Sequence, residues 1–227
     1  HLTAGRMTGN DDFRIRPGRI RSTRAPRTKS FLAQALKAAQ KAGGYSRGRR
    51  SRASKFGRGR AASLAATRLL NSRARTAMIK ARVVRRMRSP GALRAHVGYL
   101  QRDGVTRDGA HGRLFDAAGD DADGRAFAER CEGDRHHFRF IVSPDDASEL
   151  ASLRSFTREL MDQASRDLGT RLDWVAIDHW NTEHPHIHVL ARGRTDDGTD
   201  LVISRDYIAT GLPARAGDLV TRELGLR

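Results

Sequence analysis

The sequence predicts an α+β fold, in which a central antiparallel β-sheet is flanked by helices and preceded by a basic N-terminal extension. After residue 76, strand-like and helical segments follow one another without a strict strand–helix repeat, and short connections join some strands. A single cysteine, Cys131, excludes an intramolecular disulfide framework and a cysteine-rich zinc scaffold. Since the chain lacks an apolar run of about 18 residues, we expect no transmembrane helix and no membrane partner.

The expected strands are apolar and β-branched or alternate in polarity, and they cover 77–86, 136–142, 173–180 and 186–192, with a short strand at 114–115. Helices are expected over 29–42, 61–70, 92–101, 121–132 and 147–168, and again from about residue 204.

Two of these helices carry further signals. Ser89 and Pro90 are typical of an N-cap and a first helical position. Residues 143–146 are expected to end a strand and to cap the longest helix. In that helix, apolar residues recur at helical spacing, which predicts a buried face: Leu150, Leu153, Phe156, Leu160 and Met161.

Charge is distributed very unevenly along the chain. Residues 1–100 contain 26 Lys and Arg but only two acids, a net charge of +24, whereas residues 101–227 have a net charge of −7. We therefore expect a basic, partly disordered and partly helical extension over 1–72 and a globular domain over 73–227. The extension is either a solvated tail or, as its charge favours, a nucleic-acid-binding segment that uses arginines such as Arg49, Arg50, Arg58 and Arg60.

Four of the nine histidines fall between residues 179 and 188. His186 and His188 are two apart on an expected strand, so both side chains leave the same face, while Ile187 points to the opposite, apolar face. His179 ends the preceding strand and returns beside this pair if 181–185 form a turn. Three converging imidazoles predict a metal site with room for substrate oxygens. His184 and Glu183, in the turn, either support the ligands or are merely exposed to solvent.

The chain has three tyrosines, Tyr45, Tyr99 and Tyr207, and Tyr99 has the most suggestive surroundings. It lies late in an expected helix, with Arg94 and Arg102 about one turn away on either side. A phenol with a pKa of about 10 is a poor nucleophile at neutral pH. It becomes competent when a cation neutralises the phosphate that it attacks and a neighbour accepts its proton.

Three separated segments, HVGYLQRDG at 96–104, HHFRFIVSPDD at 136–146 and the histidine segment at 178–188, occur in an order that resembles the relaxase, or mobilisation nuclease, family of the HUH endonuclease superfamily. The resemblance covers about two-thirds of the chain, from near Arg75 to the C-terminus. It implies an antiparallel sheet with the metal ligands on its floor and the tyrosine helix above them. Because relatives carry long C-terminal regions, we expect the chain to continue past Arg227.

The resemblance also implies residue roles. Tyr99 matches the tyrosine that attacks the scissile phosphate, and the metal ligands match His179, His186 and His188. Glu183 stands where relatives often carry an acid.

Other positions of these motifs are open to two readings. Asn181 stands where many relatives have Asp; it lacks the charge but can accept a hydrogen bond from His179. His136 and His137 either contact the phosphate or assist proton transfer, or else they only stabilise the end of a strand. Arg94, Arg102 and Arg205 are candidate phosphate contacts.

The implied reaction is a metal-assisted transesterification that nicks one strand at an origin of transfer and leaves a 5′-phosphotyrosyl link and a free 3′-OH. The expected cofactor is Mg²⁺ or Mn²⁺, with Zn²⁺, Ni²⁺ or Co²⁺ as substitutes. The expected partners are single-stranded origin DNA, accessory relaxosome proteins and the coupling protein of a type IV secretion system. Such a protein acts in the bacterial cytoplasm and is exported with the DNA of a plasmid or integrative element.

Three alternatives remain open at the level of sequence. A rolling-circle replication initiator shares the metal site and the tyrosine. A metal-dependent phosphodiesterase would use activated water and would keep its activity without Tyr99. A non-catalytic nucleic-acid-binding protein would rest on residues 1–70 alone and leaves the histidine segment unexplained.

Overall fold

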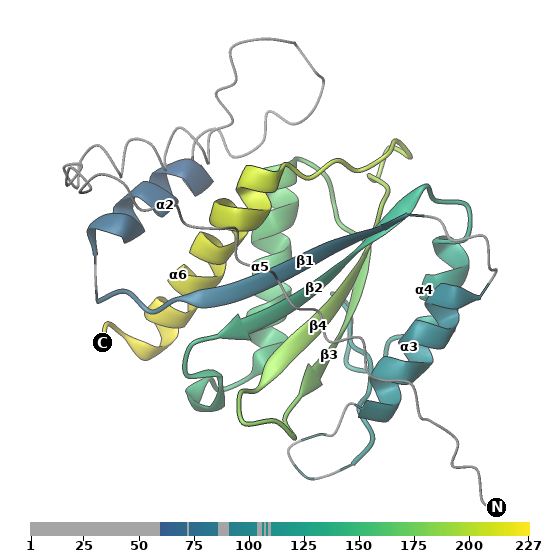
Figure 1. The fold of residues 1–227 in the computed structure, drawn as a ribbon, viewed down its shortest axis with the longest axis horizontal. Coiled ribbons are helices and arrows are strands. Elements are labelled where there is room, and N and C mark those ends of the chain that lie inside the picture. The colour runs from purple at the N-terminus through teal and green to yellow at the C-terminus, as the bar shows by residue number, and fades with distance from the viewer. Residues whose placement is uncertain (1–59, 72, 86–90, 104–105, 107, 109) are drawn as a thin grey trace, which may run out of the picture.

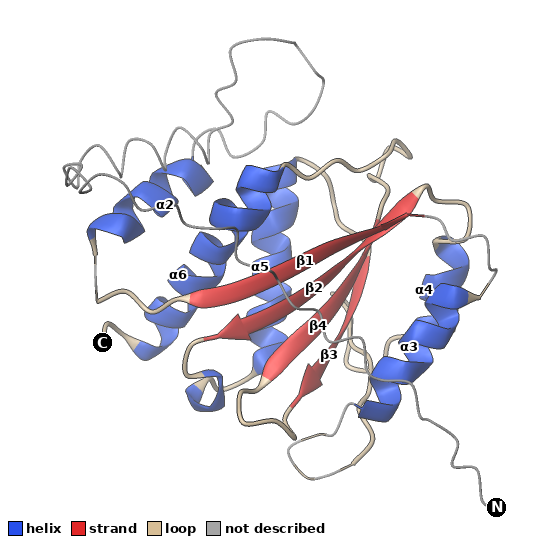
Figure 2. Cartoon of the chain, viewed as in Figure 1, coloured by secondary structure: helices blue, strands red, loops and turns tan. Residues whose placement is uncertain are grey.

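The computed structural model describes residues 60–71, 73–85, 91–103, 106, 108 and 110–227. They form an α+β arrangement in which one open, four-stranded antiparallel sheet carries helices on both faces (Figures 1 and 2). The strand order is β1-β2-β4-β3, with bounds Ala77–Arg85, His136–Pro144, Trp174–His179 and His186–Arg192 for β1 to β4. The predicted fold class and the four main strands are confirmed, whereas the expected basic extension lies almost entirely outside the described residues.

Alternate residues of each strand leave opposite faces of this sheet, and the register shows which residues share a face. On β2, Phe138 lies opposite Ala191 of β4, and its neighbour Arg139 lies opposite Leu190. One face, here called the apolar face, carries the phenylalanines of β2 and Ile187 of β4. The other, here called the histidine face, carries His186 and His188.

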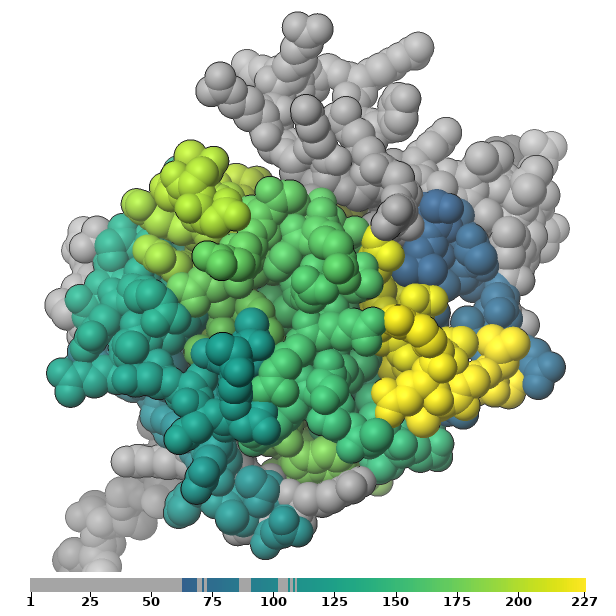
Figure 3. Space-filling view, turned by 180° about the vertical axis from the view of Figure 1, so that it is seen from behind, coloured from purple at the N-terminus to yellow at the C-terminus, as the bar shows by residue number. Residues whose placement is uncertain are grey.

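Two long helices cover the apolar face. Helix α5, Leu153–Leu168, and helix α6, Leu212–Leu224, contribute the side chains that pack against Phe140 and Ile187 in the main core. Seen from behind, α5 (green) occupies the centre of the molecule and α6 (yellow) lies beside it (Figure 3). The five apolar residues predicted to form the buried face of the longest helix are each at most 4 % exposed, although Leu150 precedes the helix itself.

Helices α3, Ala92–Asp103, and α4, Gly124–Arg130, cover part of the histidine face. Val97 and Leu100 of α3 join Phe127 of α4 over the β3 and β4 residues of that face in a second, smaller core. The two helices approach closely at Gly124, where a Cβ atom would collide with the side chains of Leu114 and Val97. The β1 and β2 part of the histidine face carries half-buried or exposed side chains; we call these residues the open half: Met78, Lys80, Arg82, His137, Arg139 and Ile141.

Three predicted elements differ from those observed. The longest helix begins at Leu153 rather than at 147, and Ser152, not residues 143–146, caps it by accepting a hydrogen bond from the Ser155 N–H. Asp146 adopts a left-handed conformation, and a separate 3₁₀ turn, η1, Ala147–Glu149, precedes the helix, so the chain turns before helical geometry can start. The expected strand at 114–115 is only an isolated bridge between Phe115 and Ala176.

The remaining helices lie at the β1 side of the sheet. Helix α2, Arg60–Leu70, matches the predicted helix 61–70 and packs against α6 through Ala65 and Ala214. A π-helical turn, η2, Tyr207–Gly211, leads directly into α6. Together, η2 and α6 form the helical C-terminus that the sequence predicted from about residue 204. The predicted helix 29–42 and the Ser89–Pro90 cap lie outside the described residues. Within the described part of the chain, no helix has the length and apolar character needed to span a membrane.

Candidate metal centre

The histidine triad lies where β3 ends and β4 begins. His179 is the last residue of β3 and pairs directly with His186, the first residue of β4, while His188 follows on the same face of β4. The ring centroids are 5.4 Å apart for His179–His186, 4.5 Å for His179–His188 and 5.0 Å for His186–His188. Among the described residues, these three form the single group of His, Cys, Asp or Glu side chains that could hold a metal ion.

The turn before β4 sets the orientation of the His186 ring. The backbone carbonyl of His184 accepts a hydrogen bond from Nδ1 of His186 at 3.0 Å, and it also accepts one from the Thr182 hydroxyl at 2.7 Å. With its proton on Nδ1, His186 presents the lone pair of Nε2 toward the triad, where Nε2 of His188 lies 3.2 Å away. The turn therefore selects the tautomer that a metal ligand needs.

The donor set and its spacing fit a divalent transition-metal ion. The candidate ligand atoms of the three histidines all lie within 4.8 Å of one another. Tetrahedral coordination with metal–nitrogen bonds of about 2.0–2.1 Å places neighbouring nitrogens about 3.4 Å apart, close to the 3.2 Å between His186 and His188. Three neutral imidazoles match Co²⁺, Ni²⁺ or Zn²⁺ better than Mg²⁺, which prefers oxygen ligands.

The other predicted residues of this segment lie in the exposed turn. The side chains of Asn181, Glu183 and His184 are exposed, and the backbone carbonyl of His184 contacts His186 of the triad. The roles of Asn181 and Glu183 stay predictions.

Tyr99 projects from α3, on the helix that covers the histidine face. Its neighbours Val97 and Leu100 are buried against the sheet, whereas Tyr99 is 60 % exposed and its ring stacks on His96 at a centroid distance of 6.5 Å. Helix α3 contacts β3, the strand that ends at His179. By contrast, Tyr207 is buried in the core, where burial and its hydrogen bond to Asp167 raise its pKa far above the ordinary value.

The two adjacent histidines of β2 separate to opposite faces. His136 lies on the apolar face, with its ring against Phe138 and its Nε2 2.9 Å from the Leu201 carbonyl oxygen, so the structure does not bring it to the triad. His137 is on the histidine face, but it is four residues along β2 from Ile141, which pairs with His188. That offset is about 13 Å of strand, so the proposed role of His137 at the reacting phosphate gains no support from the geometry.

The predicted DNA-contacting arginines have mixed positions. Arg94 extends toward α4, where it lies 3.7 Å from Glu129 and 4.0 Å from Glu132. Arg205 is exposed just before η2, a turn that packs on α6 and β1. Arg49, Arg50 and Arg58 lie outside the described residues, as do the side chains of Arg60 and Arg102.

Sequence reasoning missed Arg82 and Arg139, which lie in the open half and pair directly across β1 and β2. A usable signal was present, because alternation along 136–142 puts residues 137, 139 and 141 on one face. Which of the two faces would also carry the triad depends on the register with β4, and no local pattern in the sequence specifies that register.

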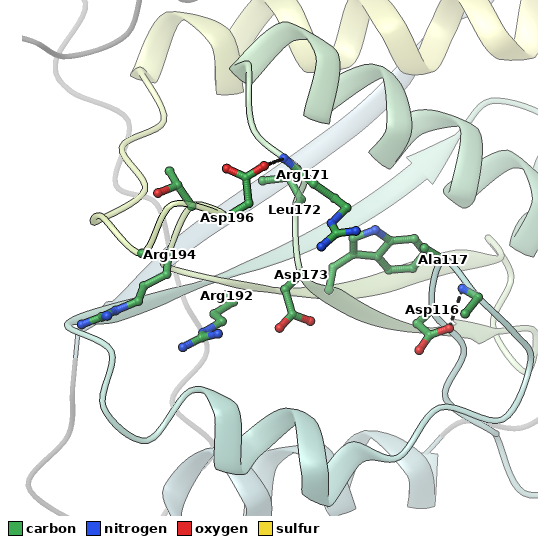
Figure 4. A pocket seen from close by; sticks show the side chains of 12 residues that line it. Asp116, Ala117, Arg171, Leu172, Asp173, Arg192, Arg194 and Asp196 are labelled. Atoms are coloured by element: carbon green, nitrogen blue, oxygen red, sulfur yellow. Dashed lines mark hydrogen bonds between the residues drawn. The ribbon is translucent and has the colours of Figure 1, made fainter.

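A separate pocket of about 510 Å³ lies at the opposite end of β3 and β4, where Trp174 begins one strand and Arg192 ends the other (Figure 4). Its charged residues are largely paired. Asp173 accepts two hydrogen bonds from Arg130, and both Arg192 and Arg194 contact the buried carboxylate of Asp134 at 2.7 and 3.0 Å. The Arg130–Asp173 pair joins α4 to the residue before β3, and the Asp134 pairs hold the end of β4 to the segment before β2.

Comparison with known proteins adds no relative to this picture. No protein-family model matches the chain, and no curated protein matches it significantly.

Proposed function

We propose that the chain is a relaxase-like nuclease of the HUH type, which nicks single-stranded DNA by transesterification to Tyr99. The observation that carries the proposal is the convergence of His179, His186 and His188 on a sheet face covered by the helix that bears an exposed tyrosine. The order of the three sequence motifs supports the same conclusion.

In the proposed reaction, the Tyr99 hydroxyl attacks the scissile phosphorus. A new bond forms between the tyrosine oxygen and phosphorus, and the bond to the 3′ oxygen breaks. The phenolic proton passes to solvent, and the departing 3′ oxygen takes up a proton from solvent. The products are a 5′-phosphotyrosyl link and a free 3′-OH, and the reverse attack rejoins the strand. His179, His186 and His188 would hold a divalent ion, which when bound would supply positive charge that stabilises the reacting phosphate.

The protein's own groups prepare this step in two ways. The His184 carbonyl fixes the tautomer of His186, so the ligand set is oriented before any ion binds. Val97 and Leu100 anchor α3 on the sheet, which holds Tyr99 on a rigid element rather than on a loop. We further propose the partners that this function requires: origin-of-transfer DNA, relaxosome proteins and the coupling protein of a type IV secretion system, which exports the protein from the bacterial cytoplasm with its DNA.

The test is a denaturing gel shift with labelled single-stranded DNA from the transfer region of the element that encodes the chain, in the presence of Mn²⁺ or Mg²⁺. We expect the wild type to form a metal-dependent band that resists SDS, and Tyr99→Phe and His186→Ala to form none. Tyr207→Phe and His111→Ala are the matched controls, because Tyr207 is buried away from the triad and His111 is an exposed histidine outside it. Both controls should form the band.

Each alternative gives a different result in this assay. Cleavage that survives Tyr99→Phe without a covalent band would identify water as the nucleophile and the chain as a phosphodiesterase. Salt-sensitive binding with no cleavage under either metal would leave only a nucleic-acid-binding protein. A covalent band on a replication origin, but not on a transfer origin, would assign the chain to rolling-circle initiation.

A further inference from the structure

The open half of the histidine face carries a cluster of cations that the metal centre does not use. Arg82 of β1 and Arg139 of β2 are direct cross-strand partners on this face, and His137 follows Arg139 on the same side of β2. His96 is half-buried on α3, the helix that covers part of this face, and the charges of Arg139 and Arg82 act on it. Like charges directly opposite each other destabilise a sheet, so their presence calls for an explanation.

These two arginines differ from most arginines of the described domain. Arg130, Arg192 and Arg215, for example, each form an ion pair of 2.7–2.8 Å with an aspartate. Within the described residues, neither Arg82 nor Arg139 has a carboxylate within ion-pair distance. The Arg139 Nε instead donates a hydrogen bond to Nε2 of His137 at 3.0 Å, so His137 serves as a neutral acceptor. A half-buried guanidinium held by a histidine keeps its positive charge available for an external anion.

The surroundings keep the two histidines neutral at physiological pH. Burial, followed by the charges of Arg139 and Arg82, lowers the pKa of His96 to about 4. Burial, followed by Arg139, His96 and His136, likewise lowers the pKa of His137 to about 4, and Asp134 opposes this only weakly. An anion bound among these groups would offset the repulsion, so the cluster is arranged for a negative ligand.

The register relates this cluster to the triad. Ile141 lies opposite His188, and Arg139 is two residues further along β2, opposite Leu190. Two residues of strand span about 7 Å, which is comparable to the separation of neighbouring phosphates in an extended single strand. Arg139, the member of the cluster on the strand next to β4, therefore lies on the face of the triad within reach of a nucleic-acid backbone that is bound at His188.

We propose that Arg82, Arg139, His96 and His137 form a second anion subsite, which binds the phosphodiester next to the one held at the histidine triad. The identity of the ligand, a single-stranded DNA backbone, rests on the proposed function. In the subsite, Arg139 and Arg82 bind the phosphate oxygens, and the two half-buried histidines line the site. It positions the strand and does not take part in bond cleavage.

The test uses the full chain and a probe with only two phosphodiesters, the trinucleotide d(TpTpT), which can occupy the triad and the subsite together but supplies no third phosphodiester. Binding is followed through the Cε1–H resonances of His96 and His137, assigned with His96→Gln and His137→Gln. In the wild type we expect the probe to shift both resonances and to raise both pKa values. Arg139→Gln should weaken this response about tenfold, the loss of one charge-assisted hydrogen-bonding partner.

Arg166→Gln is the matched control, since it removes the same charge from α5, on the other side of the sheet, where Arg166 pairs with Asp162. It should respond as the wild type does. Unmoved His96 and His137 resonances at saturating probe, or an equal response in Arg139→Gln and Arg166→Gln, would overturn the subsite.

The nicking assay separates this result from the proposed function. If the protein forms the covalent band but the His96 and His137 resonances do not move, the proposed nuclease function stands and the subsite is wrong. If the resonances respond in an Arg139-dependent way but no covalent band forms, the subsite stands and the proposed nuclease function is wrong.

Discussion

The two faces of the sheet are built from the same strands but have opposite chemistry. On β4, Ile187 is fully buried on the apolar face, whereas its neighbours His186 and His188 lie half-buried on the histidine face. On β2, Phe138 and Phe140 enter the main core, while Arg139 between them remains half-buried on the other side. The comparison shows that the two-residue period of a strand lets one segment supply stability and chemistry together, with each role confined to its own side.

The largest expected contrast is between adjacent residues of β4. Ile187→Ala should lower the free energy of unfolding by about 2–5 kcal/mol, because it removes a fully buried side chain and leaves a cavity. His188→Ala should change it by less than about 1 kcal/mol but abolish binding of Mn²⁺ or Zn²⁺. Urea unfolding and calorimetric metal titration measure the two effects. If His188→Ala destabilised the fold as much as Ile187→Ala, the separation of roles between the faces would be wrong.

A second contrast concerns pH. The folded-state pKa values of His96 and His137 are about 4, below the unfolded value of about 6.5. As pH falls from 7 to 5, the unfolded chain takes up protons at both positions and the folded chain does not, so the free energy of unfolding should decrease. At His96 the causes are burial and then the charges of Arg139 and Arg82. At His137 they are burial and then Arg139, His96 and His136, with Asp134 opposing them.

The variant His96→Gln/His137→Gln should lose much of this decrease between pH 7 and pH 5. Urea midpoints of both proteins at the two pH values provide the measurement. An unchanged pH dependence in the double variant would mean that other groups control it.

The smallest expected contrast is between the two described tyrosines. Tyr207→Phe should lower the free energy of unfolding by about 1.5 kcal/mol, because it removes a buried hydrogen bond of 3.0 Å to the Asp167 carboxylate. Arg215 continues to bind that carboxylate in the variant. Tyr99→Phe, on an exposed side chain, should change stability by less than about 0.5 kcal/mol. Thermal unfolding of the two variants tests this pair. Equal destabilisation would show that the Tyr99 hydroxyl has a structural role.

Parts of this structure follow from local sequence patterns. β4 has the bounds predicted for it, the buried residues of α5 follow from their helical spacing, and the shared face of His186 and His188 follows from the pleat of any strand. These features depend on residues only a few positions apart. The start of α5 was predicted wrongly, although it too depends on nearby residues. Both residues 143–146 and Ser152 can cap a helix. Because Asp146 adopts a left-handed conformation, α5 begins only after the cap at Ser152.

Other features were decided only by the tertiary structure, because they join segments far apart in the chain. The pairing of β2 with both β1 and β4 places Arg139 beside Arg82 and near the row of His188. The β3–β4 hairpin, which places His179 opposite His186, is by contrast local and was expected from the sequence. The register of β2 turns His136 away from the triad, although it adjoins His137 in sequence. A shift of one residue would exchange every side chain between the two faces. The sequence by itself therefore determined which residues could act, and the packing of the apolar face on α5 and α6 determined which of them meet.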